Sequence, residues 1–312
     1  MNRTISLFIL VVLLLAGCGK PEKELTKPVL PTFCLVLPNK VESWVKQIET
    51  GFSDEVKFQS ATLSVGRYDK GEAKSVIAAV KAMKPTTAVP VCIVIEDRSL
   101  VRPVVEGLLN EGIHVITVGG DDGSSPRAGH VGMSPSSCGE RWNTARRQLF
   151  PKATNALFVF GSPRFKRERL EGAFFSTTLN VNTKEIKKST NDLKYRTVSA
   201  DQLTPKDLQW ASVVTAIGED ALKNAVQLGA KNLLVVDSSP AAFDWAEGGV
   251  GRVVISANYY TVGQEAMKLA AERYTSFGNQ NPINELDYDD SVETPLPELR
   301  KRILEFSEST KK

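Results

Sequence analysis

Short apolar runs alternate with amphipathic stretches along the chain from about residue 33 onward. The run Val91–Ile95 is continuous and β-branched, which is the pattern of a strand covered on both faces. The stretch 73–83 instead carries its apolar residues at the spacing of one helical face. This pattern predicts strands at 33–37, within 56–65, and at 91–95, 113–118, 156–160, 195–198, 212–216, 233–236 and 253–256. It predicts helices at 43–52, 73–83, 100–109, 164–175, 219–228, 260–274 and 296–306.

The alternation of β and α elements defines the expected fold class. Buried strands separated by helices imply right-handed βαβ units and parallel sheets. Two such series follow each other along the chain. The sequence therefore predicts an α/β protein with two Rossmann-like lobes, each built on a parallel sheet.

The first eighteen residues indicate an export signal. Arg3 precedes an apolar run from Ile5 to Leu15, and this run has the length of a signal-peptide core. It ends in Leu15-Ala16-Gly17-Cys18, which resembles the bacterial lipobox. That resemblance implies cleavage before Cys18 and lipidation of its thiol. The alternative is an ordinary signal peptide, or an anchor helix, that happens to contain a cysteine.

The composition narrows the class of protein. The chain has 312 residues, 42% of them hydrophobic, and a formal net charge of +3. This hydrophobic content suffices for packed cores, so we expect a globular protein. Lysine and arginine are scattered along the chain, which argues against nucleic acid as a partner.

The reactive residue types indicate binding and not catalysis. Cys34 and Cys92 lie in strand-like runs, and together with Cys138 they form neither a disulfide framework nor a metal site. His114 is expected inside a strand and His130 in a loop. No nucleophile elbow, zinc-protease pair or phosphate loop is present in the sequence. We therefore expect no enzyme activity, no metal and no cofactor.

Several strings along the chain resemble the type I periplasmic binding proteins, the ribose- and galactose-binding group of sugar ABC importers. They are the run from Glu106 to Val118, the loop Asp121–Arg127 before Val131-Gly132, the stretch Gly161–Gly172, Val235-Val236-Asp237, and Asn258–Ala266. Their order and spacing carry the resemblance, which covers about residues 33 to 296.

This resemblance implies a domain organisation. The two lobes are joined by a three-segment hinge, with residues 32–133 plus 259–285 in the first lobe and 134–258 in the second. Residues 1–17 are then the signal peptide, 18–31 a tether, and 286–312 a polar C-terminal extension. The ligand binds in the cleft between the lobes, at the carboxyl ends of the strands.

The resemblance also implies ligand-binding residues. Planar, multi-donor groups pair with hydroxyls, and aromatic rings pack on the C–H face of a sugar. The candidates are Asn39, Trp44, Asp121, Arg127, Arg167, Asp237 and Asn258. Five of these have alternatives. Trp44 can pack on the sheet, Arg167 can lie on a solvated helix face, and Asp237 can cap the next helix. Asp121 and Arg127 can each be an exposed loop residue.

The chain departs from the family at other cleft positions. Gly119-Gly120 replaces an aspartate after the fourth strand, Ala216–Glu219 lacks an asparagine, and Ala257 stands where the family has a glutamine. These departures put ribose or galactose as the ligand in doubt.

Two functions follow as expectations. The first is a monomeric, lipid-anchored solute-binding protein of the cell envelope, in the periplasm or on the cell surface, that delivers a sugar or polyol to an ABC permease. The second is a sensory or interaction lipoprotein with a degenerate ligand site that presents its lobes to a membrane sensor or another membrane partner.

Overall fold

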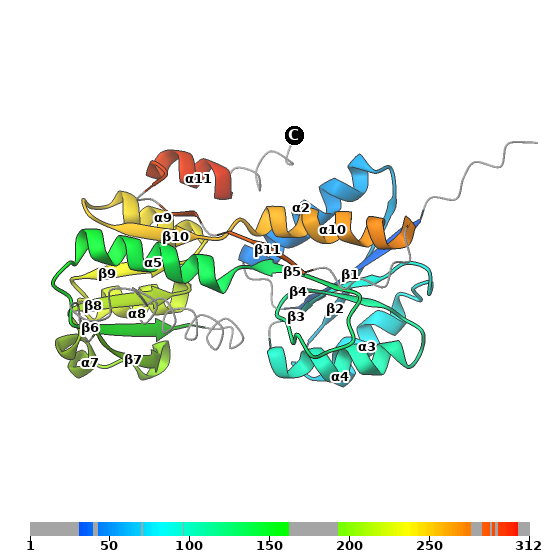
Figure 1. Ribbon diagram of the computed structural model, residues 1–312, viewed down its shortest axis with the longest axis horizontal. Helices are drawn as coiled ribbons and strands as arrows, with labels where there is room; N and C mark the ends of the chain where they lie inside the picture. Colours follow the sequence, from blue (N-terminus) through cyan, green and yellow to red (C-terminus); the bar gives the residue numbers. More distant parts are fainter. Residues whose placement is uncertain are drawn as a thin grey trace, which may run out of the picture. The chain divides into compact units, whose positions relative to one another are not determined.

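The computed structural model describes residues 31–39, 43–69, 71–95, 97–161, 193–275, 283–287, 289–290 and 293–304. Residues 31–312 form one compact unit with two six-stranded sheets (Figure 1). Helices are interleaved with the strands of both sheets. The predicted α/β class is therefore confirmed.

The first sheet has the strand order β11-β5-β4-β3-β1-β2, and all of its neighbouring strands are parallel. Its strands are β1 (Thr32–Pro38), β2 (Thr62–Tyr68), β3 (Val91–Ile95), β4 (Val115–Gly119), β5 (Gly129–Met133) and β11 (Ile283–Leu286). All five residues of β3 are buried, as its continuous apolar sequence predicted.

Two pairs of helices cover the two faces of this sheet. Helices α2 (Ser43–Phe58) and α10 (Tyr259–Thr275) pack on one face, and α3 (Ala73–Ala82) and α4 (Arg98–Leu109) on the other. Successive side chains of β1 alternate accordingly, with Leu35 in the first core and Val36 in the second. Helices α2 and α10 lie side by side (Figure 1).

The second sheet has the order β12-β10-β9-β8-β6-β7 and is parallel except for β12, which pairs antiparallel with β10. Its strands are β6 (Asn155–Phe160), β7 (Lys194–Ser199), β8 (Val213–Ile217), β9 (Leu233–Val236), β10 (Val253–Ser256) and β12 (Asp289–Asp290). Helix α5 (Pro135–Leu149) packs on one face; α8 (Glu219–Gln227), α9 (Pro240–Glu247) and α11 (Leu296–Leu304) pack on the other. Helix α7 (Pro205–Trp210) and the short 3-10 helix Ala200–Gln202 lie between β7 and β8 along the chain.

The chain passes between the two sheets three times. It does so from β5 into α5, from β10 into α10, and from β11 to β12. The first and third passages are hydrogen-bonded, because the Ser134 backbone N–H donates to the Leu286 carbonyl at 2.7 Å. These passages are the three connecting segments that the family resemblance implied.

Two histidines lie elsewhere than predicted. His114 is exposed and directly precedes β4, so its expected place inside a strand is wrong. His130, expected in a loop, is fully buried within β5. The sequence signal failed there because Gly129 and Gly132 make β5 resemble a loop. The predicted helix at 164–175 lies outside the described residues.

Candidate functional site

Asn39 follows β1 at the carboxyl end of the first sheet. Its backbone N–H donates to the Tyr68 carbonyl at 2.7 Å, which holds it beside the end of β2. Its side-chain Nδ2 donates to Oδ1 of Asp69, and both side chains are exposed. The amide orientation is thus set by Asp69, leaving the Asn39 oxygen directed away from that bond.

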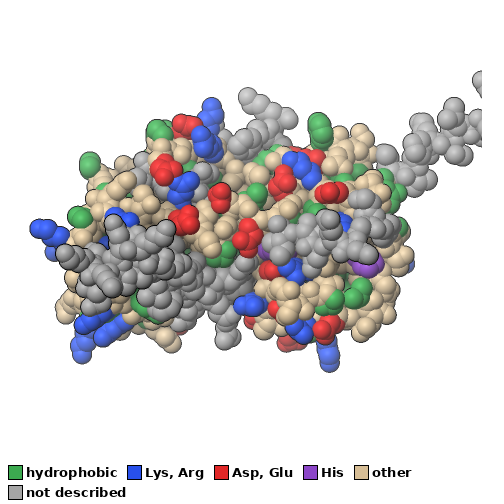
Figure 2. Space-filling model, viewed as in Figure 1, with side chains coloured by type: hydrophobic (Ala, Val, Ile, Leu, Met, Phe, Trp, Pro, Cys, Tyr) green, Lys and Arg blue, Asp and Glu red, His purple; other side chains and the backbone are tan. Residues whose placement is uncertain are grey.

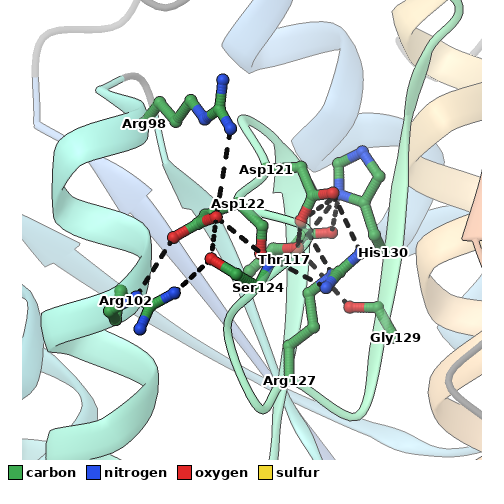
Figure 3. A network of polar contacts seen from close by, with 9 residues as sticks. All are labelled: Arg98, Arg102, Thr117, Asp121, Asp122, Ser124, Arg127, Gly129 and His130. Atoms are coloured by element: carbon green, nitrogen blue, oxygen red, sulfur yellow. Dashed lines mark hydrogen bonds and ion pairs between the residues drawn. The ribbon is translucent and has the colours of Figure 1, made fainter.

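A buried ion pair joins Asp121 and Arg127 in the loop between β4 and β5 (Figure 3). Arg127 Nε lies 2.7 Å from Asp121 Oδ1, and Nη2 donates to Oδ2 at 2.9 Å. The exposed fractions of the two side chains are 1% and 9%. This two-point pairing fixes both ends of the loop. The structure therefore brings these two candidates together, but their charged groups bind each other.

Thr117 and His130 extend this network into the sheet. They are register partners on β4 and β5, and Thr117 Oγ1 lies 3.0 Å from His130 Nδ1. His130 Nδ1 is also 3.9 Å from Asp121 Oδ1. The side chains of both residues are fully buried, so the ion pair rests on a polar patch within the sheet.

The outer side of the same loop carries a second, more exposed network around Asp122 (Figure 3). Ser124 donates to Asp122 Oδ1 through its backbone N–H at 3.1 Å and its hydroxyl at 2.6 Å. Arg102 Nε donates to Oδ2 at 3.4 Å, from helix α4. The hydrogen bonds from Ser124, and then Arg102, hold the pKa of the Asp122 carboxyl below its ordinary value.

Trp44 lies in the first turn of α2 and is only 5% exposed. Its ring packs against that of Tyr259, with 5.5 Å between centroids and an interplanar angle of 50°. Tyr259 begins α10, directly after the second passage between the sheets. Trp44 therefore contacts the residue next to Asn258.

Asp237 directly follows β9 and is half-buried. Its Oδ1 accepts from the Ser238 N–H at 2.8 Å, and its Oδ2 accepts from the Ser239 hydroxyl. Ser239 in turn caps α9 by accepting from the Ala242 N–H at 3.3 Å. The carboxylate thus supports the cap of the next helix while part of its surface stays exposed.

Asn258 precedes α10 and is also half-buried. Its Oδ1 accepts from the Thr261 N–H at 3.1 Å, which is the geometry of an N-cap. Ser238 bridges to the same turn, since its hydroxyl donates to the Ala257 carbonyl and accepts from the Ala257 N–H. Asp237 and Asn258 are therefore held on two neighbouring turns at the carboxyl ends of β9 and β10.

Gln47 of α2 reaches these turns and was not identified from the sequence. Its Nε2 donates to the Ser238 carbonyl at 3.5 Å, and it is 3% exposed. A usable signal was present, because Gln47 is a polar residue within the apolar stripe that includes Trp44, Ile48 and Phe52. Arg167 and Cys18, the two remaining candidates, lie outside the described residues.

The described ranges contain no group of three or more His, Cys, Asp or Glu side chains that could hold a metal ion. Within the same ranges, no helix is long and apolar enough to cross a membrane. Cys34, Cys92 and Cys138 are buried free thiols. On the face that Figure 2 shows, acidic and basic side chains intermingle among the coloured residues.

Comparisons with known proteins identify the fold. No family model and no curated protein matches the sequence. Solved structures do match. GanP, a glucose-galactose binding protein from Geobacillus stearothermophilus, is 14% identical at a TM-score of 0.65, over 85% of this chain and 99% of that chain. A sugar-binding protein of a sugar ABC transporter from Bacillus halodurans is 10% identical at a TM-score of 0.70, over 86% and 99%.

A third match is the XylFII–LytSN complex, at 15% identity and a TM-score of 0.65, over 84% of this chain and 98% of that chain. Identities this low carry information about the fold alone. The strand orders, the three passages and these full-length matches agree with one another. The chain therefore has the fold of the type I periplasmic binding proteins, as the order of its sequence strings predicted.

Proposed function

We propose that this protein is an extracytoplasmic solute-binding protein that captures a small polar ligand between two lobes and delivers it to an ABC permease. The observation that carries the proposal is the pair of parallel sheets joined by three chain passages. Open α/β sheets bind ligands at the carboxyl ends of their strands. Asn39, Asp237 and Asn258 occupy such ends, and each keeps part of its side chain exposed.

The chemistry of these side chains favours a sugar or polyol as ligand. A carboxylate and two amides accept and donate hydrogen bonds to hydroxyls. Asn258 uses its oxygen as a helix cap, so its amide nitrogen, which has no hydrogen-bond partner among the described residues, is the group available to a ligand. In this proposal Trp44 supplies an aromatic ring next to the ligand, and Arg167 supplies a further planar hydrogen-bond donor. In this proposal Asp121 and Arg127 act mainly by holding the loop after β4 in place.

The lobes in this proposal keep the boundaries expected from the sequence, 32–133 plus 259–285 and 134–258. Cys18 carries a lipid that anchors the mature, monomeric protein to a membrane of the cell envelope, with 18–31 as the tether. The segment 286–312 follows these ranges along the chain, and its β12 and α11 belong to the second sheet and its core. No catalytic step is assigned to any residue, and neither a cofactor nor nucleic acid is part of the function.

A thermal-shift screen tests this function. Residues 31–312 form one compact unit, so the chain without its first 25 residues is a suitable sample. The screen covers sugars, polyols, nucleosides and amino acids. A ligand present at one hundred times its dissociation constant stabilises the protein by about 2.7 kcal/mol. A shift confined to sugars and polyols supports the proposal, whereas silence from every sugar and polyol contradicts it.

The second candidate is a sensory or interaction lipoprotein with a degenerate ligand site. The burial of Arg127 against Asp121 favours it, because two groups suited to hydroxyl binding are already paired with each other. The XylFII–LytSN match is itself a complex. Co-purification of the full chain from membranes discriminates the two: a permease with its ATPase supports transport, and a membrane sensor supports the second candidate.

A further inference from the structure

The side-chain amide of Gln47 is poorly satisfied although it is buried. Its nitrogen makes one long contact, 3.5 Å to the Ser238 carbonyl. Its Oε1 is buried and accepts no hydrogen bond from any described residue. An amide oxygen has two lone pairs, and leaving it without a donor in a buried position costs stability.

The surroundings make this cost avoidable. Gln47 belongs to the buried stripe of α2, where Trp44, Ile48 and Phe52 pack in the apolar core. A leucine or methionine fills a similar volume and leaves no oxygen unpaired. The presence of a glutamine here is therefore explained if a hydrogen-bond donor reaches Oε1 in the ligand-bound protein.

The position of Gln47 indicates where that donor comes from. Ser238, the one hydrogen-bond partner of Gln47 among the described residues, donates its backbone N–H to Asp237 and bridges to Ala257 through its hydroxyl. Asp237 directly precedes Ser238, the residue to which Gln47 donates. Asn258 directly follows Ala257, the residue to which the Ser238 hydroxyl donates. Gln47 comes from a helix of the first sheet, whereas these turns belong to the second. The amide is the point where α2 meets the proposed ligand-binding turns.

We propose that Gln47 is a specificity-determining residue of the ligand site, whose Oε1 accepts a hydrogen bond from one hydroxyl of a bound sugar or polyol. The inference rests on the proposed function and deepens it. The long contact from Nε2 to Ser238 is weak enough to yield as α2 and the turn after β9 adjust around the ligand. A ligand lacking that one hydroxyl leaves Oε1 unpaired and binds more weakly.

The test compares the unmodified protein with Gln47→Leu, Gln47→Met and the control Gln59→Leu. Gln59 lies just after the end of the same helix, is exposed, and donates to Glu55. Isothermal titration uses D-glucose, D-galactose, D-ribose and L-arabinose, followed by the monodeoxy analogues of the sugar that binds best. Melting temperatures are recorded without ligand.

The expected result has three parts. Both Gln47 variants melt at or above the temperature of the unmodified protein, since they remove an unpaired buried oxygen. Both bind the best sugar at least about tenfold more weakly, and Gln59→Leu binds it unchanged. One monodeoxy analogue loses affinity for the unmodified protein by a similar factor and loses none for the Gln47 variants.

The other outcomes overturn the inference in different ways. A lower melting temperature of both variants without ligand assigns Gln47 a structural role. Unchanged affinity, or equal losses for every analogue in all proteins, removes it from the ligand site. If the unmodified protein binds none of the four sugars, nor any polyol in the thermal-shift screen, the proposed function falls and this inference with it.

Discussion

Arg127 and Asp121 form an ion pair that is almost completely buried, with Nε 2.7 Å from Oδ1, six residues apart in the loop between β4 and β5. Removing one partner leaves the other charge buried and unpaired. We expect Arg127→Met to destabilise the protein by about 3–5 kcal/mol, measured by urea unfolding. Arg102→Met is the matched control. It removes a half-exposed arginine of α4 that pairs with Asp122 in the same loop, and it should cost at most about 1 kcal/mol.

The double variant Asp121→Leu/Arg127→Met separates the ion pair from its desolvation. Replacing both charges by apolar groups should restore much of the stability that Arg127→Met loses. Equal losses in the single and double variants would mean that the loop depends on the pair itself, and not on avoiding an unpaired charge.

The crossing of α2 and α10 requires glycine on both helices. A Cβ added to Gly263 would lie 2.1 Å from the Ile48 carbonyl oxygen, and one added to Gly51 would lie 2.0 Å from the Tyr260 oxygen. Both obstacles are backbone atoms, so the helices must move apart. We expect Gly263→Ala to destabilise at the upper end of the range of about 1–3 kcal/mol for overpacking, or beyond it.

Gly123→Ala is the control for this crossing, because a Cβ at Gly123 meets no atom within 4 Å. Thermal unfolding of the two variants side by side measures the difference. Equal melting temperatures would show that α2 and α10 do not approach as closely as the structure describes.

The fold was predictable because its strands are apolar on both faces. The runs 91–95, 156–160 and 233–236 have no amphipathic alternation, and β3, β6 and β9 coincide with them. Other elements gave no such signal. Helix α5 carries four charged side chains among its 15 residues, and β12 is the acidic pair Asp289–Asp290. Their formation depends on packing against the rest of the chain.

The site was less predictable than the fold, for a different reason. Asp121, Arg127, Asp237 and Asn258 were identified from the sequence, but whether a polar group faces a ligand or a neighbour depends on loop geometry. The pairing of Arg127 with Asp121 follows from how the loop folds back over β5. Gln47 was missed because its role depends on contact with a turn 191 residues away in sequence.

The three core thiols should be inert in the folded protein. Burial raises the pKa of the Cys34, Cys92 and Cys138 thiols, so little thiolate, the reactive form, exists at pH 8. In a chain with Cys18→Ser, we expect no thiol to react with a disulfide reagent within minutes, and all three to react in guanidinium chloride. Rapid reaction of any one under native conditions would contradict the burial of that thiol.

Cys18 should determine membrane association. If it carries a lipid, the expressed full chain sediments with membranes after a carbonate wash, and Cys18→Ser moves it to the soluble fraction or leaves it uncleaved. Intact-mass measurement of the mature chain should show the added lipid. A wild-type chain that is cleaved but soluble would favour an ordinary signal peptide, and membrane retention of an uncleaved chain without lipid would favour an anchor helix.

Asp237 should bind ligand as well as support the cap of α9. Asp237→Asn keeps an oxygen for the Ser238 N–H and removes the charge, so the fold should persist. Loss of one charged hydrogen bond costs about 1.5–3 kcal/mol, or roughly ten- to a hundredfold in affinity for the best-binding sugar in titration calorimetry. Arg167→Ala should lose affinity by a similar factor. Asp201 is exposed and lies in the short 3-10 helix that follows β7 of the same sheet, so Asp201→Asn should lose no affinity.

If Asp237→Asn lowers the melting temperature but binds the sugar as tightly as the unmodified protein, the carboxylate serves only the turn after β9. The ligand must then be sought at the carboxyl ends of the first sheet, beside Asn39.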